Sequence, residues 1–270
     1  MASKKKSGGT AKPLNMPTVG GPERGPLVWL VASFLSIFVR IMFRVKFVGG
    51  RENLPKKGGY VLVQNHVTNV DGLGMAYFIF WRLRRLPHFL AKESLFRVPV
   101  LGWCLLQLGQ IPVFRGTNVR NDEPMRVAID HLKAGQVICI YPEGTLTRDP
   151  DLWPMRGKSG ALRLALAAGV PIIPAGQWGT EEILPTYSSK FRPGFWKPMR
   201  ILVGKEFKVD ELRGREVTTL ELAEATSRLM SEITKLVEVL RNEEAPEKRH
   251  DPASHGQSIT GNFNKPKKGK

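Results

Sequence analysis

Short apolar runs and longer segments of helical periodicity alternate along the chain. Runs rich in Val, Ile, Leu, Phe and Tyr predict strands, and they cover residues 45–48, 60–63, 88–92, 111–114, 137–141, 170–175 and 200–203. Segments whose apolar residues recur three or four positions apart predict helices, and they cover residues 72–82, 96–108, 123–133, 159–168 and 218–241. This alternation indicates an α/β fold, in which a mixed, largely parallel sheet is covered by helices.

The first apolar segment, residues 26–39, predicts a helix at a membrane surface. Fourteen helical residues span about 21 Å, which is less than the roughly 30 Å of a bilayer's hydrocarbon core. The polar positions in and just after the segment recur at steps of three, four and four, which places them on one helix face: Ser33, Ser36, Arg40 and Arg44. We therefore expect residues 26–48 to contain an amphipathic membrane-interface helix and the first strand. A helix packed on the core and a short transmembrane span are the alternatives.

The chain carries 41 Lys and Arg against 24 Asp and Glu in 270 residues, a formal net charge of +17. This charge implies an anionic partner, which could be membrane lipid, nucleic acid or a phosphorylated substrate. Residues 1–25 and 242–270 are basic and lack an apolar pattern, so we expect a disordered arm and a disordered tail around one domain over 49–241. The segment 26–39 favours an anionic membrane surface over nucleic acid. The aromatic, arginine-rich stretch 77–86 suits the same surface, or a buried helix with a charged end.

A histidine follows the predicted strand 60–63 within the run Gln64-Asn65-His66-Val67-Thr68-Asn69-Val70-Asp71. On one regular helix the side chains of His66 and Asp71 would lie about 140° apart, but a turn followed by a helix start can fold Asp71 back onto the imidazole. There the carboxylate would fix the tautomer and favour the protonated ring, as in a catalytic triad. A structural histidine is the alternative.

Two further polar stretches follow predicted strands. Arg115 comes after the strand 111–114, and its planar guanidinium suits a phosphate. Tyr141-Pro142-Glu143-Gly144-Thr145 closes the next strand; its glycine lets backbone N–H groups approach an anion, and its threonine adds a hydroxyl. Because ligands of open α/β sheets bind at the carboxyl ends of strands, we expect these stretches to converge with His66. A surface turn is the alternative for each stretch alone.

Three other chemistries lack support in the sequence. The remaining histidines, at positions 88, 131, 250 and 255, have no paired-ligand spacing, so we expect no metal site. No Gly-x-Ser-x-Gly elbow is present, which argues against a serine acyl-enzyme. Gly157-Lys158-Ser159 matches the end of a phosphate-binding loop, but the glycine required five positions earlier is Leu152, which argues against nucleotide hydrolysis.

Four blocks, in order, resemble the lysophospholipid/glycerolipid acyltransferase family, the 1-acylglycerol-3-phosphate acyltransferases. Asn65-His66 with Asp71 is similar to the NHxxxxD block, residues 109–115 to GxIxxxR, residues 141–145 to FPEGT, and residues 170–174 to VPIIP. The resemblance covers about residues 27–205. One position departs from it, since the family often has Arg directly after Glu-Gly-Thr, where this chain has Leu146 and then Arg148 two positions further on.

The resemblance implies transfer of a fatty acyl group from acyl-CoA or acyl carrier protein to the free hydroxyl of 1-acylglycerol-3-phosphate, which gives phosphatidic acid. No metal or bound cofactor is needed. His66 would be the general base, Asp71 would orient it, and Asn65 would position the reacting groups or stabilise the oxyanion. The expected phosphate-binding residues are Arg115, Glu143, Gly144, Thr145, Arg148 and Lys158, among which Glu143 would orient Arg or Lys.

The resulting hypothesis is a monotopic or peripheral acyltransferase at the cytoplasmic face of the cell membrane. Its partners would be a lysophospholipid, the acyl donor and an anionic membrane surface, with no nucleic acid. Two alternatives stay open. The acceptor could be another lysolipid or a glycolipid, or the chain could be a non-catalytic, basic peripheral membrane protein.

Overall fold

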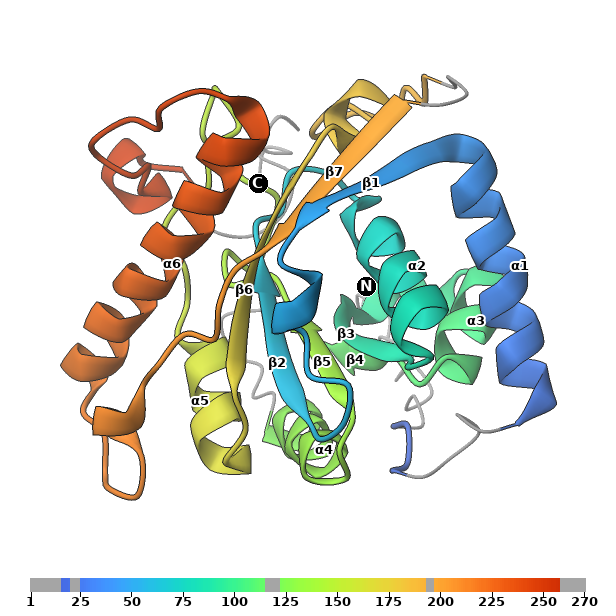
Figure 1. Cartoon of the computed structure of the whole chain (residues 1–270), viewed down its shortest axis with the longest axis horizontal. Helices are drawn as coiled ribbons and strands as arrows, with labels where there is room; N and C mark the ends of the chain where they lie inside the picture. Colours follow the sequence, from blue (N-terminus) through green and yellow to red (C-terminus); the bar gives the residue numbers. More distant parts are fainter. Residues whose placement is uncertain (1–15, 20–24, 115–121, 193–196, 258–270) are drawn as a thin grey trace, which may run out of the picture.

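One seven-stranded sheet forms the centre of the computed structural model (Figure 1), which describes residues 16–19, 25–114, 122–192 and 197–257. The strands are β1 (Phe43–Gly49), β2 (Tyr60–Gln64), β3 (Pro87–Lys92), β4 (Ile111–Val113), β5 (Val137–Ile140), β6 (Ile172–Trp178) and β7 (Lys197–Val203). Their order across the sheet is β1-β7-β6-β2-β5-β3-β4. β6, β2, β5, β3 and β4 are parallel to one another, whereas β7 pairs antiparallel with β6 and parallel with β1. The predicted mixed, largely parallel sheet is confirmed.

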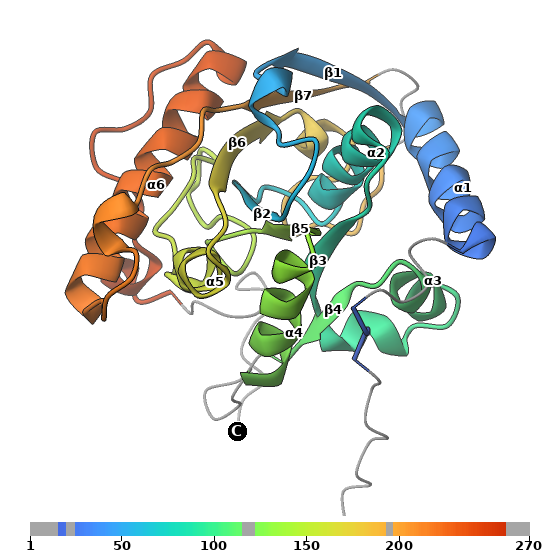
Figure 2. The same cartoon turned by 60° about the horizontal axis from the view of Figure 1, so that its bottom comes forward.

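Helices cover both faces of this sheet, as Figures 1 and 2 show. One face carries α4 (Asp122–Lys133), α5 (Gly160–Ala168) and α6 (Thr219–Arg241). The other carries α1 (Pro26–Met42) and α2 (Asp71–Leu83), and the short α3 (Leu101–Gln107) contacts α1. The molecule therefore has three layers, and the sheet lies between two layers of helices.

Strand β2 lies near the middle of the sheet and is buried on both faces. Val61 and Val63 belong to the core beneath α4, α5 and α6, whereas Tyr60 and Leu62 belong to the core beneath α2. A strand covered on both sides needs apolar residues at every position. This is why its sequence is a continuous apolar run that does not alternate with polar residues.

A capping box is present at the start of α6. The Thr218 hydroxyl accepts from the Glu221 backbone N–H at 3.2 Å, and the Glu221 carboxylate accepts from the Thr218 N–H at 2.8 Å. Gly169 ends α5 with φ +70°, a conformation that glycine adopts without strain. These boundaries follow from local residue chemistry.

The continuous helix expected over residues 96–108 is wrong. A 3-10 helix, η3 (Glu93–Arg97), ends before residue 98, and α3 begins only at Leu101. Pro99 has no N–H to continue a helical ladder, and Val100 adopts φ +58°, outside the right-handed helical region. The apolar content of this segment predicted burial in a helix, but part of it lies on the surface.

Helix α1 buries one face against the rest of the protein. The prediction that Ser33, Ser36, Arg40 and Arg44 form an exposed polar face of this helix is wrong at two positions. Ser36 is buried, at 5% exposure. Arg44 lies in β1, because the helix ends at Met42. The outward face carries apolar side chains instead, namely Leu27, Leu30, Phe34, Ile37, Phe38 and Ile41. None of the helices in the described ranges has both the length and the apolar character needed to cross a bilayer.

Residues 243–257 lie against α6 and the loop before α5, although we expected a disordered tail from residue 242. Arg156 donates to the Asp251 carboxylate at 2.9 Å through its side chain and to the His250 carbonyl at 3.0 Å through its backbone. Irregular backbone held by such scattered polar contacts leaves no periodic pattern in the sequence. Residues 258–270 lie outside the described residues, as does the expected arm 1–25 apart from residues 16–19 and 25.

Candidate active site

The carboxyl ends of β2, β5 and β6 meet at one edge of the sheet (Figure 1), and the loops after them carry most of the predicted site residues. His66 follows β2, and Glu143 follows β5. The Thr147 N–H donates to the His66 carbonyl at 2.7 Å, which ties these two loops together. Open α/β sheets bind their ligands at this edge.

His66 and Asp71 form the pair that the sequence predicts. Nδ1 of the His66 imidazole lies 2.9 Å from Oδ2 of Asp71. The same oxygen accepts the backbone N–H groups of Val67 at 2.6 Å and Thr68 at 2.8 Å, so Asp71 is the acceptor and Nδ1 carries the proton. Nε2 is then the basic nitrogen, and the His66 side chain is 15% exposed. Asp71 reaches the imidazole because it is the first residue of α2 and follows a turn.

Two threonine hydroxyls hold the other oxygen of Asp71. Oδ1 accepts from Thr68 Oγ1 at 2.9 Å and from Thr180 Oγ1 at 2.6 Å. Thr180 follows β6, and the turn that places it needs Gly179, whose φ is +108° and whose added Cβ would lie 2.1 Å from the Pro198 carbonyl oxygen. The short spacing from Thr68 to Asp71 is a local signal, but no sequence signal links Thr180 to a residue 109 positions away.

Tyr141 stacks on the imidazole of His66. The two ring centroids are 3.9 Å apart, and the ring planes differ by 17°. Burial raises the pKa of Tyr141 well above its ordinary value, so the phenol is neutral at physiological pH. The Tyr141 ring thus restrains the orientation of the imidazole plane, while Asp71 hydrogen-bonds to the imidazole edge at Nδ1. The sequence marked Tyr141 only as part of a motif.

Glu143 is buried behind the site. Its carboxylate accepts the backbone N–H of His66 at 2.9 Å and that of Met155 at 3.2 Å. Besides these amides it interacts with the Thr147 side chain, and its charge opposes the effect of burial, which lowers the pKa of Arg249. The expectation that Glu143 orients Arg or Lys stays a prediction. Burial raises the pKa of Glu143 to about 8, although the two N–H groups act in the opposite direction. Glu143 therefore fixes the backbone at His66.

Asn65 joins β2 to β6. Its Nδ2 donates to the Gln177 carbonyl at 3.0 Å, and its Oδ1 accepts from the Gln177 N–H at 2.9 Å. The residue is 1% exposed. Both ends of the carboxamide are therefore occupied by the sheet, which supports positioning of the neighbouring His66 over direct contact with an oxyanion.

The expected phosphate-binding residues Gly144 and Lys158 are neighbours. Gly144 has φ +71°, and a Cβ added there would lie 3.0 Å from Nζ of Lys158. The Lys158 backbone N–H also donates to the Pro142 carbonyl at 2.8 Å. Thr145 lies in the same loop and is largely buried. The folded chain therefore brings a cation, a hydroxyl and a glycine turn to the end of β5.

Arg148, which stands two positions after the unusual Leu146, is buried at 2% exposure. It lies near Tyr187. Burial raises the pKa of that tyrosine, and the Arg148 guanidinium opposes the rise. The Tyr187 hydroxyl donates to the Leu146 carbonyl at 2.7 Å. Arg115 lies outside the described residues, so its expected place in the site stays a prediction.

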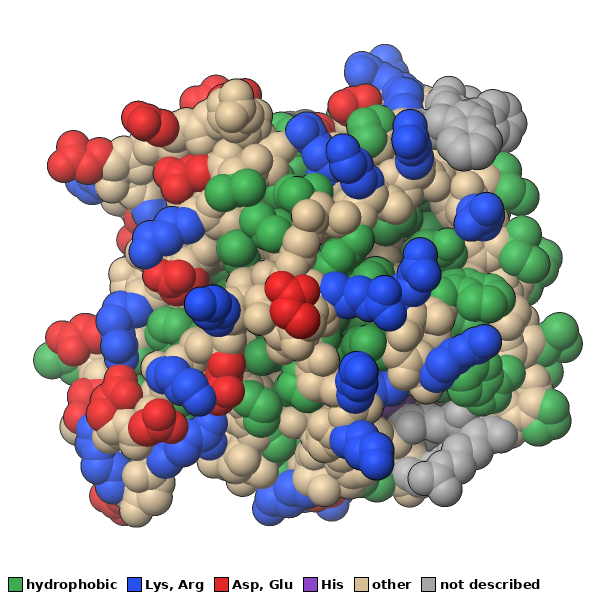
Figure 3. All heavy atoms as spheres, viewed as in Figure 1, with side chains coloured by type: hydrophobic (Ala, Val, Ile, Leu, Met, Phe, Trp, Pro, Cys, Tyr) green, Lys and Arg blue, Asp and Glu red, His purple; other side chains and the backbone are tan. Residues whose placement is uncertain are grey.

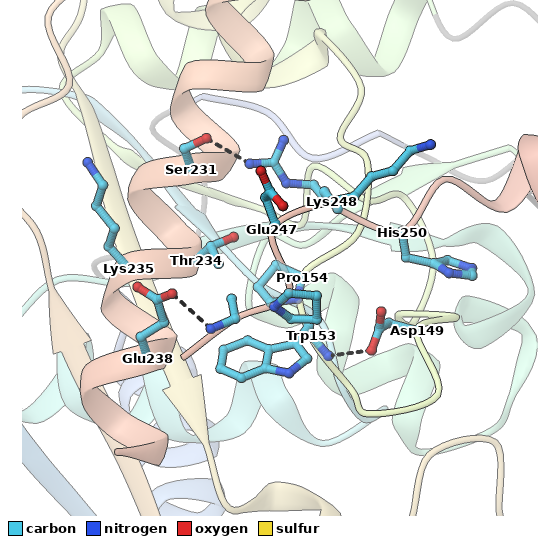
Figure 4. A pocket seen from close by; sticks show the side chains of 13 residues that line it. Asp149, Trp153, Pro154, Ser231, Thr234, Lys235, Glu238, Glu247, Lys248 and His250 are labelled. Carbon is cyan, nitrogen blue, oxygen red and sulfur yellow. Dashed lines mark hydrogen bonds between the residues drawn. The ribbon is translucent and has the colours of Figure 1, made fainter. Parts of the chain in front are cut away.

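A separate hollow of about 290 Å³ lies between α6 and the C-terminal segment (Figure 4). Trp153, Lys235 and His250 are among its lining residues, and none of the predicted site residues lines it in the described part of the chain. Within the described ranges, no three His, Cys, Asp or Glu side chains are grouped to hold a metal ion.

Known proteins share this sequence pattern. The family model described as acyltransferase matches residues 45–178. The chloroplastic 1-acyl-sn-glycerol-3-phosphate acyltransferase BAT2 of Brassica napus is 31% identical over 147 residues, which cover 52% of this chain and 39% of the relative. The 1-acyl-sn-glycerol-3-phosphate acyltransferase of Bacillus subtilis is 31% identical over 150 residues, which cover 55% of this chain and 69% of the relative. The chain thus spans about two fifths of the length of the chloroplast relative.

A solved structure shares the fold. The 1-acyl-sn-glycerophosphate (LPA) acyltransferase PlsC from Thermotoga maritima aligns with a TM-score of 0.60 over 82% of each chain, at 24% identity. The α/β fold and the sequence relatives therefore indicate the same class of protein. The chain belongs to the acyltransferase family that includes the 1-acylglycerol-3-phosphate acyltransferases.

Proposed function

We propose that this chain transfers a fatty acyl group from acyl-CoA or acyl carrier protein to the free hydroxyl of 1-acylglycerol-3-phosphate, which gives phosphatidic acid. The observation that carries the proposal is the hydrogen bond of 2.9 Å between His66 Nδ1 and Asp71 Oδ2 at the carboxyl edge of the sheet. The relatives from Brassica napus and Bacillus subtilis are named for this activity.

In the proposed reaction, His66 Nε2 takes the proton of the acceptor hydroxyl as its oxygen attacks the thioester carbonyl. The new C–O bond forms, the C–S bond breaks, and the imidazolium returns the proton to the departing thiolate. Asp71 stabilises the imidazolium without itself being protonated, as the acid of a catalytic triad does. General-base catalysis of this kind contributes roughly 10²–10⁴ in rate. No bound metal or cofactor takes part in this scheme.

The acceptor's phosphate would bind at the loop after β5. Lys158 lies against Gly144 there, Thr145 adds a hydroxyl, and Arg148 and Arg115 are the candidate guanidinium partners. A lysine and a glycine turn are suited to an anion because one supplies charge and the other lets backbone N–H groups approach.

The membrane partner is argued from α1. Its outward side chains include Leu30 at 67% exposure and Phe34 at 70%, and the chain's net charge is +17. Apolar side chains on a basic protein suit insertion at an anionic lipid surface. We place this surface at the cytoplasmic face of the cell membrane, where the protein would be monotopic or peripheral.

The test is acyl transfer by the purified full chain with acyl-CoA or acyl carrier protein and a panel of lysolipids. His66→Ala is expected to lower kcat/KM for 1-acylglycerol-3-phosphate by at least about 100-fold, because no base remains. His255→Ala removes an exposed histidine and is the matched control, with activity unchanged. Full activity of the His66→Ala variant would exclude the mechanism, and an inactive wild type would favour a non-catalytic membrane protein.

Acyl transfer to another acceptor lipid is the second candidate function, and Leu146 favours it. An apolar residue stands where relatives often carry Arg, and Arg148 is buried. If the headgroup pocket differs accordingly, the panel will show a higher kcat/KM for another lysolipid or a glycolipid than for 1-acylglycerol-3-phosphate.

A further inference from the structure

Apolar side chains outside α1 are also exposed, and they gather in residues 95–103. Val100 is 76% exposed, the highest value among the exposed large apolar side chains of the described residues. The others in this segment are Leu95, Val98, Leu101 and Trp103. This segment comprises η3, the break after it and the start of α3. A soluble surface rarely gathers so many apolar side chains unless it contacts a partner or a membrane.

The backbone of this segment is strained at its most exposed point. Val100 has φ +58°, a conformation that is a genuine outlier for a β-branched residue. Strain of this kind persists where the surrounding structure holds it, and it often marks functional segments. Here it interrupts the expected helix and leaves Val100 facing solvent.

The segment lies beside the apolar face of α1. α3 contacts α1, and both views of the fold show them as neighbours (Figures 1 and 2). In the space-filling view, apolar side chains line the edge of the molecule where α1 lies (Figure 3). Arg40 of α1 and Lys92, the N-cap of η3, are exposed on the same two elements, whereas Arg97 of η3 is paired with Glu93. The surface is therefore apolar and carries positive charge.

The same surface borders the catalytic edge of the sheet. β1 runs antiparallel to β2, so the end of α1 that precedes β1 lies at the edge where β2 ends. β3 is parallel to β5 and hence to β2, and η3 follows β3 directly. Both elements thus reach the edge at which His66 lies.

We propose that residues 95–103 are a second membrane-inserting element, which together with the outer face of α1 docks the protein on an anionic lipid bilayer. The choice of a lipid partner rests on the proposed function. Charge favours a bilayer over a second copy of this chain, because a self-complementary contact would bring Arg40 and Lys92 of the two copies together. A docked bilayer would border the site edge, so that a lipid acceptor could reach His66 without crossing water.

The first test compares two double variants that each replace two exposed apolar residues with Glu. Val100→Glu with Trp103→Glu alters the proposed surface, and Leu220→Glu with Val239→Glu alters α6, in the opposite helix layer. Binding of the full chain to vesicles of phosphatidylglycerol and phosphatidylcholine is measured by co-sedimentation. The first pair is expected to weaken binding at least about tenfold and the α6 pair to leave it unchanged. Equal binding by both pairs would overturn the proposal.

A second test does not depend on the fold of a charged variant. Vesicles with brominated acyl chains are expected to quench the Trp103 emission, obtained as the difference between the wild type and Trp103→Phe. An unquenched Trp103 would overturn the proposal, as would a dimer that the Val100→Glu and Trp103→Glu pair dissociates without a change in vesicle binding. Acyl transfer to detergent-dispersed substrate is measured in parallel, since an inactive wild type that still inserts Trp103 would contradict the proposed function alone.

Discussion

The carboxylate of Asp71 accepts hydrogen bonds from His66 Nδ1, from the backbone N–H groups of Val67 and Thr68, and from the hydroxyls of Thr68 and Thr180. Asp71 is completely buried. A buried charge of this kind is tolerated because its oxygens are fully hydrogen-bonded. At the scale of single residues, the histidine is therefore oriented by an acid whose own position is set by several other groups.

Thr180→Val is expected to lower kcat about tenfold, because a hydrogen bond to a charged group contributes roughly 1.5–3 kcal/mol and the freed carboxylate can turn from the imidazole. KM for both substrates is expected to stay unchanged, since Thr180 acts only through Asp71. Steady-state kinetics measure both values. Thr180→Ser, which restores a hydroxyl, should recover most of the activity.

Thr226→Val is the matched control for this prediction. The Thr226 hydroxyl is buried and donates to the Leu222 carbonyl at 2.6 Å inside α6, far in sequence from the site. A similar fall in kcat for both variants would show that the loss reflects general stability and not the position of Asp71.

At the scale of elements, Arg241 connects the end of α6 to the loop that follows the site. Its guanidinium carbon lies 3.9 Å from the Trp153 ring centroid and 4.3 Å from that of Trp178. It also donates to the Asp151 carbonyl at 2.7 Å. The Trp153 carbonyl in turn accepts the Thr147 hydroxyl at 2.6 Å. A cation between two rings thus holds the C-terminal helix against the loop beside His66.

Arg241→Ala is expected to lower the free energy of unfolding by about 2 kcal/mol, because the side chain is largely desolvated between the rings. Arg228→Ala is the control on the same helix. Its side chain is 56% exposed and pairs with Glu211, so a change of less than about 1 kcal/mol is expected. Urea denaturation followed by circular dichroism measures both, and equal losses would contradict the role given to the two tryptophans.

At the scale of the whole molecule, burial of acidic groups links stability to pH. Burial raises the pKa of Glu143 to about 8 and that of Glu181 to about 7, and the charge of Asp71 adds to both rises. A carboxyl with a raised pKa binds its proton more tightly in the folded protein than in the unfolded chain. Its contribution to stability is full below its ordinary pKa and is lost as pH rises through the folded value.

Glu143→Gln is therefore expected to flatten the dependence of unfolding free energy on pH between about 5 and 8. The wild type should lose roughly a few kcal/mol over this range, at about 1.4 kcal/mol for each unit of pKa shift. The slope of unfolding free energy against pH is compared, and not its absolute value, because the variant also changes the hydrogen bonds to His66 and Met155. Denaturant unfolding at several pH values measures this slope. Glu224→Gln, at an exposed position of α6, should keep the wild-type slope, and a steep slope in Glu143→Gln would assign the effect to another group.

Most elements were predictable because their information is local. The buried strand at residues 60–63 and the capping box at Thr218 depend on neighbours a few positions away. The helix expected at 96–108 was wrong because apolar residues do not reveal whether they face the core or the outside. The same ambiguity affected α1, whose apolar side chains occur on both faces while Ser36 is buried.

By itself, the sequence determined an α/β fold of the acyltransferase family, with a histidine and an aspartate after a buried strand, because strand patterns and motif spacing are local properties of consecutive residues. Only the tertiary structure decided that Tyr141 stacks on His66, that Thr180 holds Asp71 and that Glu143 binds backbone amides. These contacts join segments up to 109 positions apart. They form only when the carboxyl ends of β2, β5 and β6 are brought together by the parallel pairing of the sheet.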